Sequence, residues 1–418
     1  MGIVSSLSCP KCGWKAPSSR VFQCTTCAVV LEACVEIKHL TRSHLLDIRK
    51  RPDATIWRWF EFFPIAGRSA IVSLGEGYTP LLRAGRLGEE IGLSRLYLKN
   101  DTVLPTGSLK DRSNAVGISR GRELGFKTAA VISTGNAAAS VAAYAAAAGL
   151  QSVVIVPAGI SPAKVIQARA YGAKVVVIKG NFEEAARLYK TAVQEYGWYD
   201  CLSTNPYRNE GKKSYAFELF DQLDEHVPHW IIHPTAGGTG LYAMWKGYSE
   251  LVSLGWAHRL PRLVAAQSEA AAPIVSAFEK GLAHVEPVTA RATVAESIQV
   301  GNPSSMGWRG LEALRSSKGA AAALSEREIL EAQSLLACLT GIFAEPAGSI
   351  SVAAARRLRT QGTIAQGDLV VCNITGHGLK QPSAITISDE ELRPIAPDLS
   401  ALQGRLQKAE SSARGGKV

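Results

Sequence analysis

Short apolar runs alternate with helix-length segments along most of the chain. Runs rich in β-branched residues are followed, after a few glycine or polar residues, by segments long enough to form helices. The predicted strands are 129–132, 152–156, 174–178, 230–233, 263–267 and 369–374, and helices are predicted to begin at Asn136, Ser161 and Phe182. Strands that alternate with helices of about 10–15 residues indicate βαβ units and a largely parallel sheet covered on both faces. The pattern therefore predicts an α/β enzyme body.

The two ends of the chain depart from this pattern. Residues 1–38 are expected to form a cysteine-rich module, residues 39–75 a connecting segment, and residues 76–395 the enzyme body. The connecting segment carries the aromatic residues Trp57, Trp59, Phe60, Phe62 and Phe63. We interpret them as a packing face that docks the segment onto the body, with cation or nucleic-acid binding as the weaker alternative. Residues 396–418 are expected to be a flexible tail, with a short amphipathic helix through Glu410 before a frayed end.

The composition excludes several classes of protein. Hydrophobic residues make up 46% of the chain and charged residues only 20%, so the chain is expected to fold rather than to be disordered. The most apolar run, 136–150, is mostly alanine and is shorter than the roughly 20 residues of a membrane span. The amino terminus lacks the pattern of a secretion signal. We therefore expect a cytoplasmic protein that does not enter a membrane.

The positive charge of the chain allows two kinds of partner. Lysine and arginine together number 46 against 36 acidic residues, which gives a net charge of +10. Basic residues near the amino terminus, such as Lys11, Lys15 and Arg20, form no continuous stripe, so no nucleic-acid partner is expected. A positive field also attracts small phosphorylated or carboxylated molecules.

Four cysteines in the amino-terminal module have the spacing of a metal site. Cys9 and Cys12 form one Cys-x-x-Cys pair, and after an eleven-residue interval Cys24 and Cys27 form another. Two such pairs can close a tetrahedral Cys₄ zinc site, which supplies folding energy that so short a segment cannot obtain from a core. We expect zinc at this site. The alternative is a small packed module with free thiols.

Lys110 follows a turn of proline, threonine, glycine and serine and stands just before the small-residue helix predicted at 113–119. The positive end of a helix dipole disfavours a lysine at this position, so its placement needs a reason. One reason is that a depressed pKa makes the amine nucleophilic and able to form a Schiff base. The alternative is a surface lysine paired with Asp111.

Three further segments at strand ends carry glycines and hydroxyl groups. Residues 133–140 expose backbone N–H groups suited to a carboxylate or phosphate, or are merely a capped helix start. Residues 235–240 match neither the P-loop nor a full dinucleotide pattern and suit a single phosphate, with a tight turn without ligand as the alternative. In the last segment Thr375 can hydrogen-bond a ring nitrogen, and His377 is either a base or a plain loop histidine.

A Schiff-base lysine, a phosphate cradle and a ring-nitrogen partner are the parts that pyridoxal phosphate needs. The sequence resembles the threonine synthases of the fold type II pyridoxal-phosphate family, from about residue 74 to residue 382. The matching segments are LGEGYTPL (74–81), PTGSLKDR (105–112), STGNAAAS (133–140), NPYRNEGKK (205–213), IQVGNP (298–303), EPA (345–347) and TGHGLK (375–380). The resemblance implies a tryptophan synthase β-like α/β fold of two interleaved subdomains with mostly parallel sheets, preceded by a zinc-ribbon-like module.

The resemblance also implies roles for individual residues. Lys110 would be the catalytic Schiff-base lysine, Asn136 the partner of the cofactor's phenolic oxygen, and Thr375 the partner of its pyridine nitrogen. The phosphate loop of the cofactor would consist of Ala236, Gly237, Gly238, Thr239 and Gly240. The substrate would be held by Ser133, Thr134, Ala137, Ser203 and Arg208, of which the last two would contact its phosphate.

The activity implied by the resemblance is that of a homodimeric lyase, which converts O-phospho-L-homoserine and water to L-threonine and phosphate. The alternatives are a cysteate-synthase-like enzyme acting on O-phosphoserine, a threonine dehydratase, or a protein that binds pyridoxal phosphate without turnover. The chain departs from the family pattern at Leu109, Leu202, Ala236 and Thr239. These departures leave the cofactor chemistry intact but keep the choice of phosphorylated amino-acid substrate open.

Overall fold

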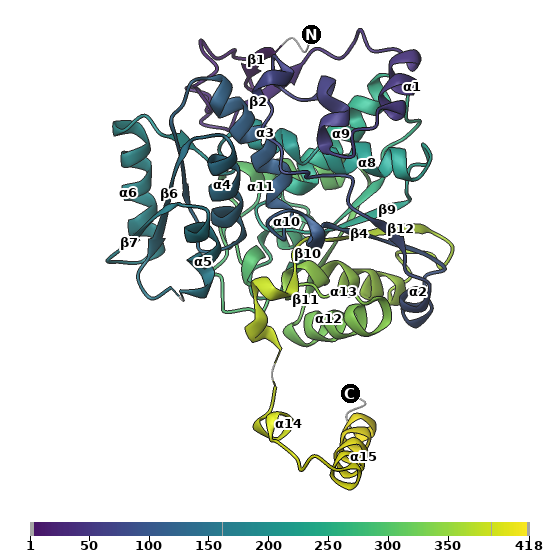
Figure 1. The fold of residues 1–418 in the computed structure, drawn as a ribbon. Helices are drawn as coiled ribbons and strands as arrows, with labels where there is room; N and C mark the ends of the chain where they lie inside the picture. Colours follow the sequence, from purple (N-terminus) through teal and green to yellow (C-terminus); the bar gives the residue numbers. More distant parts are fainter. Residues whose placement is uncertain (1–3, 161, 386, 416–418) are drawn as a thin grey trace. The chain divides into compact units, whose positions relative to one another are not determined.

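The structure is a computed structural model that describes residues 4–160, 162–385 and 387–415 (Figure 1). The chain divides into two units, Met1–Gln381 and Pro382–Val418. The second unit contains the helices α14 (Asp389–Leu392) and α15 (Leu399–Gly415). The tail helix therefore extends beyond the predicted end at Glu410, whereas the predicted helix start at Ser161 lies outside the described residues.

The larger sheet has six strands and is parallel except at one edge. Its strand order is β11 (Ala320–Leu324), β10 (Arg262–Ser268), β9 (Trp230–Pro234), β12 (Leu369–Ile374), β4 (Arg95–Asn100) and β3 (Leu81–Arg83). Side chains alternate between the two faces, so Ile231 of β9 joins one apolar cluster and Ile232 joins another. Both faces are covered by helices, as is usual for parallel strands.

The helices divide between these two faces according to the cluster that their buried residues join. The face of Ile231 is covered by α8 (Ser214–Gln222), α9 (Thr239–Ser253), α10 (Pro273–Glu279) and α11 (Ser304–Ser316). The face of Ile232 is covered by α2 (Gly85–Ile91), α12 (Glu326–Thr340) and α13 (Pro346–Thr360). Strands β9, β12 and β4 thus lie inside the molecule, and their carboxyl ends lead into buried loops.

The smaller sheet is parallel throughout (Figure 1). Its order is β7 (Lys174–Ile178), β6 (Gln151–Pro157), β5 (Thr128–Ile132) and β8 (Tyr199–Asp200). One face packs on α4 (Asn136–Ala147) and α5 (Ala163–Ala170), and the other packs on α6 (Phe182–Glu195). The predicted strands and the helices beginning at Asn136 and Phe182 are confirmed. None of the helices in the described ranges combines the length and apolar character needed to cross a bilayer.

Helix α3 (Lys110–Glu123) is buried over most of its length and packs against both α4 and α7 (Pro206–Gly211). The close contact with α7 depends on glycine. A Cβ atom at Gly117 would lie 2.4 Å from Cγ of Arg208, and one at Gly211 would lie 1.9 Å from the carbonyl oxygen of Arg112. Small residues at these positions let the two helices approach, which sets the distance between Lys110 and the residues of α7.

A buried group of charged side chains supports the first turn of α3. Arg112 donates to Asp101 at 2.8 Å and pairs with Glu218 of α8, which also binds the Lys99 amine at 2.6 Å. All four side chains are fully inaccessible to solvent. Because each buried charge has an opposite partner, the group is satisfied as a whole and holds the start of the helix in place.

The amino-terminal module contains β1 (Val4–Ser8) and β2 (Glu32–Val35), which pair antiparallel. It is followed by α1 (Arg42–Lys50) and by the 3₁₀ segment η1 (Ile56–Phe62). The rings of Trp59 and Phe62 contact Phe217 of α8, with centroid distances of 5.3 and 4.6 Å. The aromatic cluster is therefore a packing face, as predicted.

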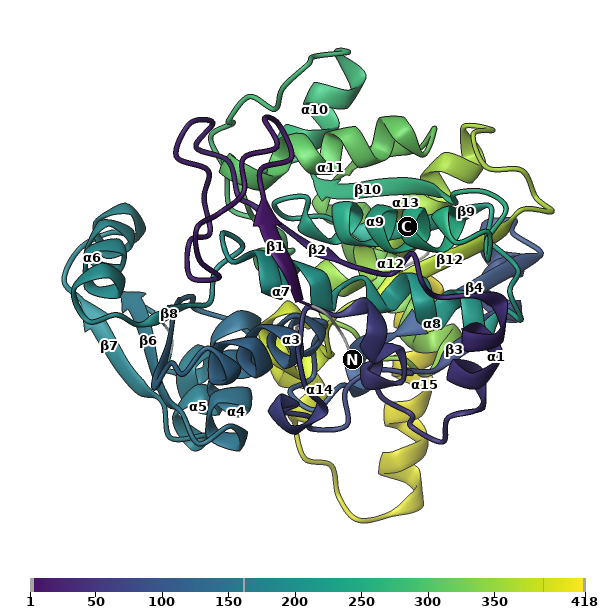
Figure 2. The same cartoon turned by 90° about the horizontal axis from the view of Figure 1, so that it is seen from above.

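The same module lies against α7 (Figure 2). The ring of Tyr207 meets Phe22 edge-to-face, and its hydroxyl donates to the Ser19 carbonyl at 3.1 Å. The amine of Lys246 on α9 binds Glu32 of the module at 3.0 Å and Glu210 of α7 at 2.7 Å. Apolar and ionic contacts thus join the module to the helix that carries Arg208.

Candidate active site

Lys110 occupies the first position of α3, and its side chain lines a narrow cavity at the carboxyl ends of β9 and β12. The amine has no hydrogen bond or ion pair among the described residues. Burial lowers the pKa of the Lys110 amine; the nearby carboxylate of Glu345 opposes this shift, and the positive charge of Arg208 adds to it. The neutral, nucleophilic amine is therefore favoured relative to an ordinary lysine.

Asp111 does not pair with Lys110. It is buried and accepts hydrogen bonds from the backbone N–H and hydroxyl of Thr106, at 2.7 and 2.6 Å. The alternative of a surface lysine paired with Asp111 is therefore wrong. The turn before the helix is tied to Asp111 instead, which leaves the lysine free to reach the cavity.

The loop 236–240 follows β9, includes the first two residues of α9, and lines the same cavity. Gly238 has a φ of +85°, in the left-handed region that favours glycine, and a Cβ at Gly237 would meet only open space. The N–H groups of residues 236–238 have no acceptor among the described residues. The first turn of α9 adds further N–H groups that no helix can satisfy internally. These unpaired donors form a cradle that fits a phosphate group.

Thr375 and His233 complete the inner wall of the cavity. The Thr375 carbonyl accepts the N–H of Leu109 at 2.9 Å, which ties the end of β12 to the residue before Lys110. The hydroxyl of Thr375 has no partner among the described residues. Burial, together with the positive charges of Lys212 and Lys110, lowers the pKa of His233 to about 3, so this imidazole stays neutral.

A second, larger pocket of about 450 Å³ shares Ser297 and Glu345 with the first. Thr134, Gly135 and Asn136 line it from the start of α4. The amide nitrogen of Asn136 donates to both Glu345 oxygens, at 3.0 and 3.1 Å, and the hydroxyl of Ser297 donates to one of them at 2.7 Å. The two cavities therefore meet at one buried carboxylate, and the second is large enough for a small ligand.

The residues predicted to bind the substrate differ in their burial and in their distance from the cavities. The guanidinium of Arg208 is buried, donates to Asn114 at 2.8 Å, and lies close enough to Lys110 to affect its pKa. Ser203 is exposed, and its carbonyl accepts from Asn209. Ser133 and Ala137 are partly buried beside Thr134 and Asn136 but do not line either cavity. Arg208 thus lies near Lys110, although neither Arg208 nor Ser203 lines either cavity.

His377 is held by its own loop. Its ring nitrogen accepts the N–H of Leu379 at 3.1 Å, and its ring packs edge-on against Phe343. These contacts fit the plain loop histidine rather than a base.

Among the residues that line the narrow cavity, sequence reasoning did not predict the side chains of Lys212, His233, Ser297 and Glu345 as part of the site. Lys212 and Glu345 do fall in segments that resemble the family, NPYRNEGKK and EPA, and that was the available signal. Ser297 directly precedes a third such segment, and His233 ends a predicted strand. No local pattern distinguishes these side chains from structural ones.

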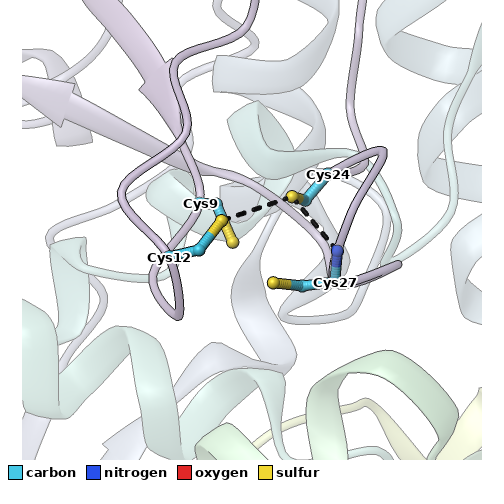
Figure 3. Close-up of side chains that lie close together, drawn as sticks. All are labelled: Cys9, Cys12, Cys24 and Cys27. Carbon is cyan, nitrogen blue, oxygen red and sulfur yellow. Dashed lines mark hydrogen bonds between the residues drawn. The ribbon is translucent and has the colours of Figure 1, made fainter.

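The four cysteines of the amino-terminal pairs converge (Figure 3). Their sulfur atoms all lie within 4.8 Å of one another, and those of Cys12 and Cys24 are 3.7 Å apart. A tetrahedral zinc ion with Zn–S bonds of about 2.3 Å requires sulfur separations of about 3.8 Å. All four cysteines are free of disulfides. The donor set therefore fits a tetrahedral metal ion.

Comparisons with known proteins agree with this geometry. Residues 72–376 match the family of pyridoxal-phosphate dependent enzymes. Threonine synthase of Methanocaldococcus jannaschii is 38% identical over 401 residues, which cover 96% of this chain and 99% of the relative. Threonine synthase of Methanosarcina acetivorans is 37% identical over 399 residues, which cover 95% of this chain and 97% of the relative.

Solved structures share the fold at lower identity. Maize serine racemase has a TM-score of 0.63 at 19% identity and covers 80% of this chain and 93% of its own. The processed form of threonine deaminase isoform 2 from Solanum lycopersicum has a TM-score of 0.61 at 18% identity, covering 75% of this chain and 85% of its own. The predicted α/β fold with mostly parallel sheets is therefore confirmed.

Proposed function

The chain belongs to the threonine synthase family of pyridoxal-phosphate-dependent enzymes, and from this premise we propose that it converts O-phospho-L-homoserine and water to L-threonine and phosphate. It would thus act as a carbon–oxygen lyase on a phosphate ester. The observation that carries the proposal is the Lys110 amine, which has no partner within the described ranges and shares one cavity with a loop whose backbone N–H groups likewise lack acceptors there.

The residues of the narrow cavity fit pyridoxal phosphate. Lys110 would attach it, the loop 236–240 would hold its phosphate, and Thr375 and Asn136 would face its ring nitrogen and phenolic oxygen. When bound, this cofactor supplies an electrophilic carbon and a ring that delocalises negative charge from a neighbouring carbon. A neutral hydroxyl such as that of Thr375 does not keep a proton on the ring nitrogen.

Lys110 is also the proposed proton carrier. Its neutral amine can take the proton from Cα of the substrate, and it must give that proton up to another atom of the bound molecule before it can take one from Cβ. Glu345 favours the protonated form of this amine, and would therefore stabilise it while it holds each proton. The Asn136 and Ser297 hydrogen bonds hold the Glu345 carboxylate in place for this role.

The larger pocket would orient the substrate. Thr134 and the N–H groups at the start of α4 are placed to bind the carboxylate, and Arg208 is proposed to bind the phosphate that leaves from Cγ. Holding both ends would decide which bond of the substrate is aligned for cleavage.

The test compares two phosphorylated amino acids. The purified protein, supplied with pyridoxal phosphate, should release phosphate from O-phospho-L-homoserine and form threonine in a one-to-one ratio. O-phosphoserine should release phosphate much more slowly. Failure to form threonine would contradict the proposal, and pyruvate or 2-oxobutyrate as the product would indicate a different lyase on the same fold.

Arg208 provides a prediction about substrate affinity. The variant Arg208→Gln should raise the KM for O-phospho-L-homoserine by about tenfold or more, because a charge-assisted bond to the substrate phosphate would be lost. The exposed Arg187→Gln on α6 serves as the control. If the KM changed by the same factor in both variants, the assignment of Arg208 to the phosphate site would be wrong.

We further propose that the Cys₄ group binds one structural zinc ion. The purified protein should contain one zinc per chain by atomic absorption, and Cys24→Ser should lose the metal and lower the Tm, because the module has only a small core. The control is Cys338→Ser, since Cys338 is exposed on α12 outside the module. The proposal would be contradicted if the purified wild-type protein contained no zinc and Cys24→Ser had the same Tm as the wild type.

Three further proposals rest on the family resemblance and the sequence: a homodimeric assembly, a cytoplasmic location, and the division into residues 1–38, 39–75, 76–395 and 396–418. Light scattering of the purified protein tests the first. Limited proteolysis tests the last, since cleavage should concentrate beyond residue 395.

A further inference from the structure

Lys212 directly follows α7 and lines the narrow cavity, and its surroundings differ from those of the lysine next to it. Lys213 is fully buried, and its amine binds the Phe62 carbonyl at 2.8 Å and the carboxylates of Glu210 and Glu250 at 2.8 Å. The amine of Lys212 has no hydrogen bond or ion pair among the described residues. Of two adjacent lysines, one is therefore used by the fold, and the other is left to face the cavity.

The charges around Lys212 are positive. Burial lowers the pKa of Lys212 well below its ordinary value, and the nearby charges of Lys110 and Arg208 lower it further. Lys212 in turn helps to lower the pKa of His233, so these side chains lie close together. The carboxylate of Glu345 lines the same cavity, but it is held by Asn136 and Ser297.

The fold provides no reason for an unpaired amine at this position. The Lys212 side chain is partly buried, and a partly desolvated amine that has no hydrogen-bond partner among the described residues costs free energy in either protonation state. The cavity that Lys212 lines also contains the loop 236–240, whose N–H groups of residues 236–238 lack acceptors among the described residues. An unpaired amine and a cradle of unpaired N–H groups in one cavity are complementary to a single anion with several oxygen atoms.

We propose that Lys212 is a phosphate-binding residue, whose amine binds a phosphate group in the narrow cavity together with the N–H groups of the loop 236–240. The identity of the phosphorylated molecule rests on the proposed function, which brings two phosphates to this region, one on the cofactor and one on the substrate. A bound anion would stabilise the protonated form of the Lys212 amine, which burial and the nearby Lys110 and Arg208 otherwise disfavour. Lys212 would thus add a positive charge to the backbone dipoles of the loop 236–240 when the anion is bound.

The test measures binding rather than turnover. The full-length protein, freed of cofactor, is titrated with pyridoxal phosphate, with pyridoxal, which lacks the phosphate, and with inorganic phosphate, using intrinsic fluorescence and Tm as readouts. The variants are Lys212→Met and Lys212→Arg, and the control is Lys179→Met, an exposed residue after β7. Lys212→Met should keep the Tm of the ligand-free protein, because it removes no hydrogen bond or ion pair of the amine among the described residues.

The two sources of phosphate give different results. If Lys212 binds the cofactor's phosphate, Lys212→Met should weaken pyridoxal phosphate binding by about tenfold or more, while pyridoxal binding stays within about twofold of the wild type. If it binds the substrate's phosphate, cofactor affinity should be unchanged, and the cofactor-loaded variant should bind inorganic phosphate about tenfold more weakly. In both cases Lys212→Arg should restore much of the loss.

The inference would be overturned if Lys212→Met bound both pyridoxal phosphate and inorganic phosphate as tightly as the wild type does. This applies to the cofactor-free protein and to the cofactor-loaded protein. A lower Tm of the ligand-free variant would also overturn it, because it would indicate a structural role. Both readouts are independent of threonine formation. A protein that makes no threonine but loses phosphate binding with Lys212 would refute the proposed function and leave this inference standing.

Discussion

Replacing Lys110 with alanine is expected to reduce threonine formation from O-phospho-L-homoserine by at least about a thousandfold. Loss of a positioned proton carrier alone costs about 10²–10⁴ in rate, and this variant would also lose the attachment point of the cofactor. Borohydride treatment followed by peptide mass spectrometry should locate the cofactor on Lys110 in the wild type and find no attachment in the variant. Phosphate release and threonine are measured in the same samples.

The control for this substitution is Lys179→Ala, which removes an exposed lysine and should leave the rate unchanged. Lys212 is the competing candidate, since its amine also lacks a partner among the described residues and lines the same cavity. Attachment of the cofactor to Lys212 in the wild type, or a rate within tenfold of normal for Lys110→Ala, would show that the catalytic lysine has been assigned to the wrong residue.

Glu218→Gln is expected to lower the free energy of unfolding by about 3–5 kcal/mol. Glu218 is buried and binds both Arg112 and Lys99, so its neutralisation leaves two buried cations with Asp101 as their remaining partner. The effect should appear as a lower midpoint of denaturant unfolding. A surface control is Glu331→Gln, whose partners Arg327 and Arg356 are exposed, so a loss of less than about 1 kcal/mol is expected.

The loss should also depend on pH. Burial alone would raise the pKa of Glu218, but Arg112 and Lys99 outweigh burial and lower it from 4.5 to about 2. The folded protein therefore binds this proton more weakly than the unfolded chain, so the stabilisation is complete above pH 4.5 and is lost as the pH falls towards 2. The difference between wild type and Glu218→Gln should be constant from pH 6 to 8 and shrink below about pH 4.5. A difference that does not change with pH would contradict the assigned charge state.

The parts of the site that could be predicted from sequence are those with a local signal. Lys110, the loop 236–240 and Thr375 each follow a strand or turn directly, and parallel strands bring their carboxyl ends to one edge of the sheet. Glu345 and Lys212 reach the same cavity only through the packing of α13 and α7. Tertiary packing, and not spacing along the chain, decides that Lys213 is paired while Lys212 has no partner among the described residues.

The fold could be predicted to a similar extent. Alternating runs correctly located β5, β6, β7, β9, β10 and β12, but the other strands of the described residues were not predicted. Among these, β11 was missed because its sequence is mostly alanine, a residue with low β propensity. The order of strands could not be predicted either. β12 pairs with β4, which lies far earlier in the chain, and this places Thr375 beside Leu109. Such long-range pairing depends on the complete core rather than on any local pattern.

The contacts between the amino-terminal module and α7 have a practical consequence for any shortened version of the protein. A chain beginning at the connecting segment would expose the buried ring of Tyr207 and leave Lys246 without Glu32. The residue next to Tyr207 is Arg208. Loss of the packing around Tyr207 would therefore also displace Arg208, which is proposed to bind the substrate phosphate. Trimming the first 38 residues to obtain a minimal catalyst should therefore yield a chain that aggregates or binds substrate poorly, and enzyme made in zinc-depleted cells should have the same defect.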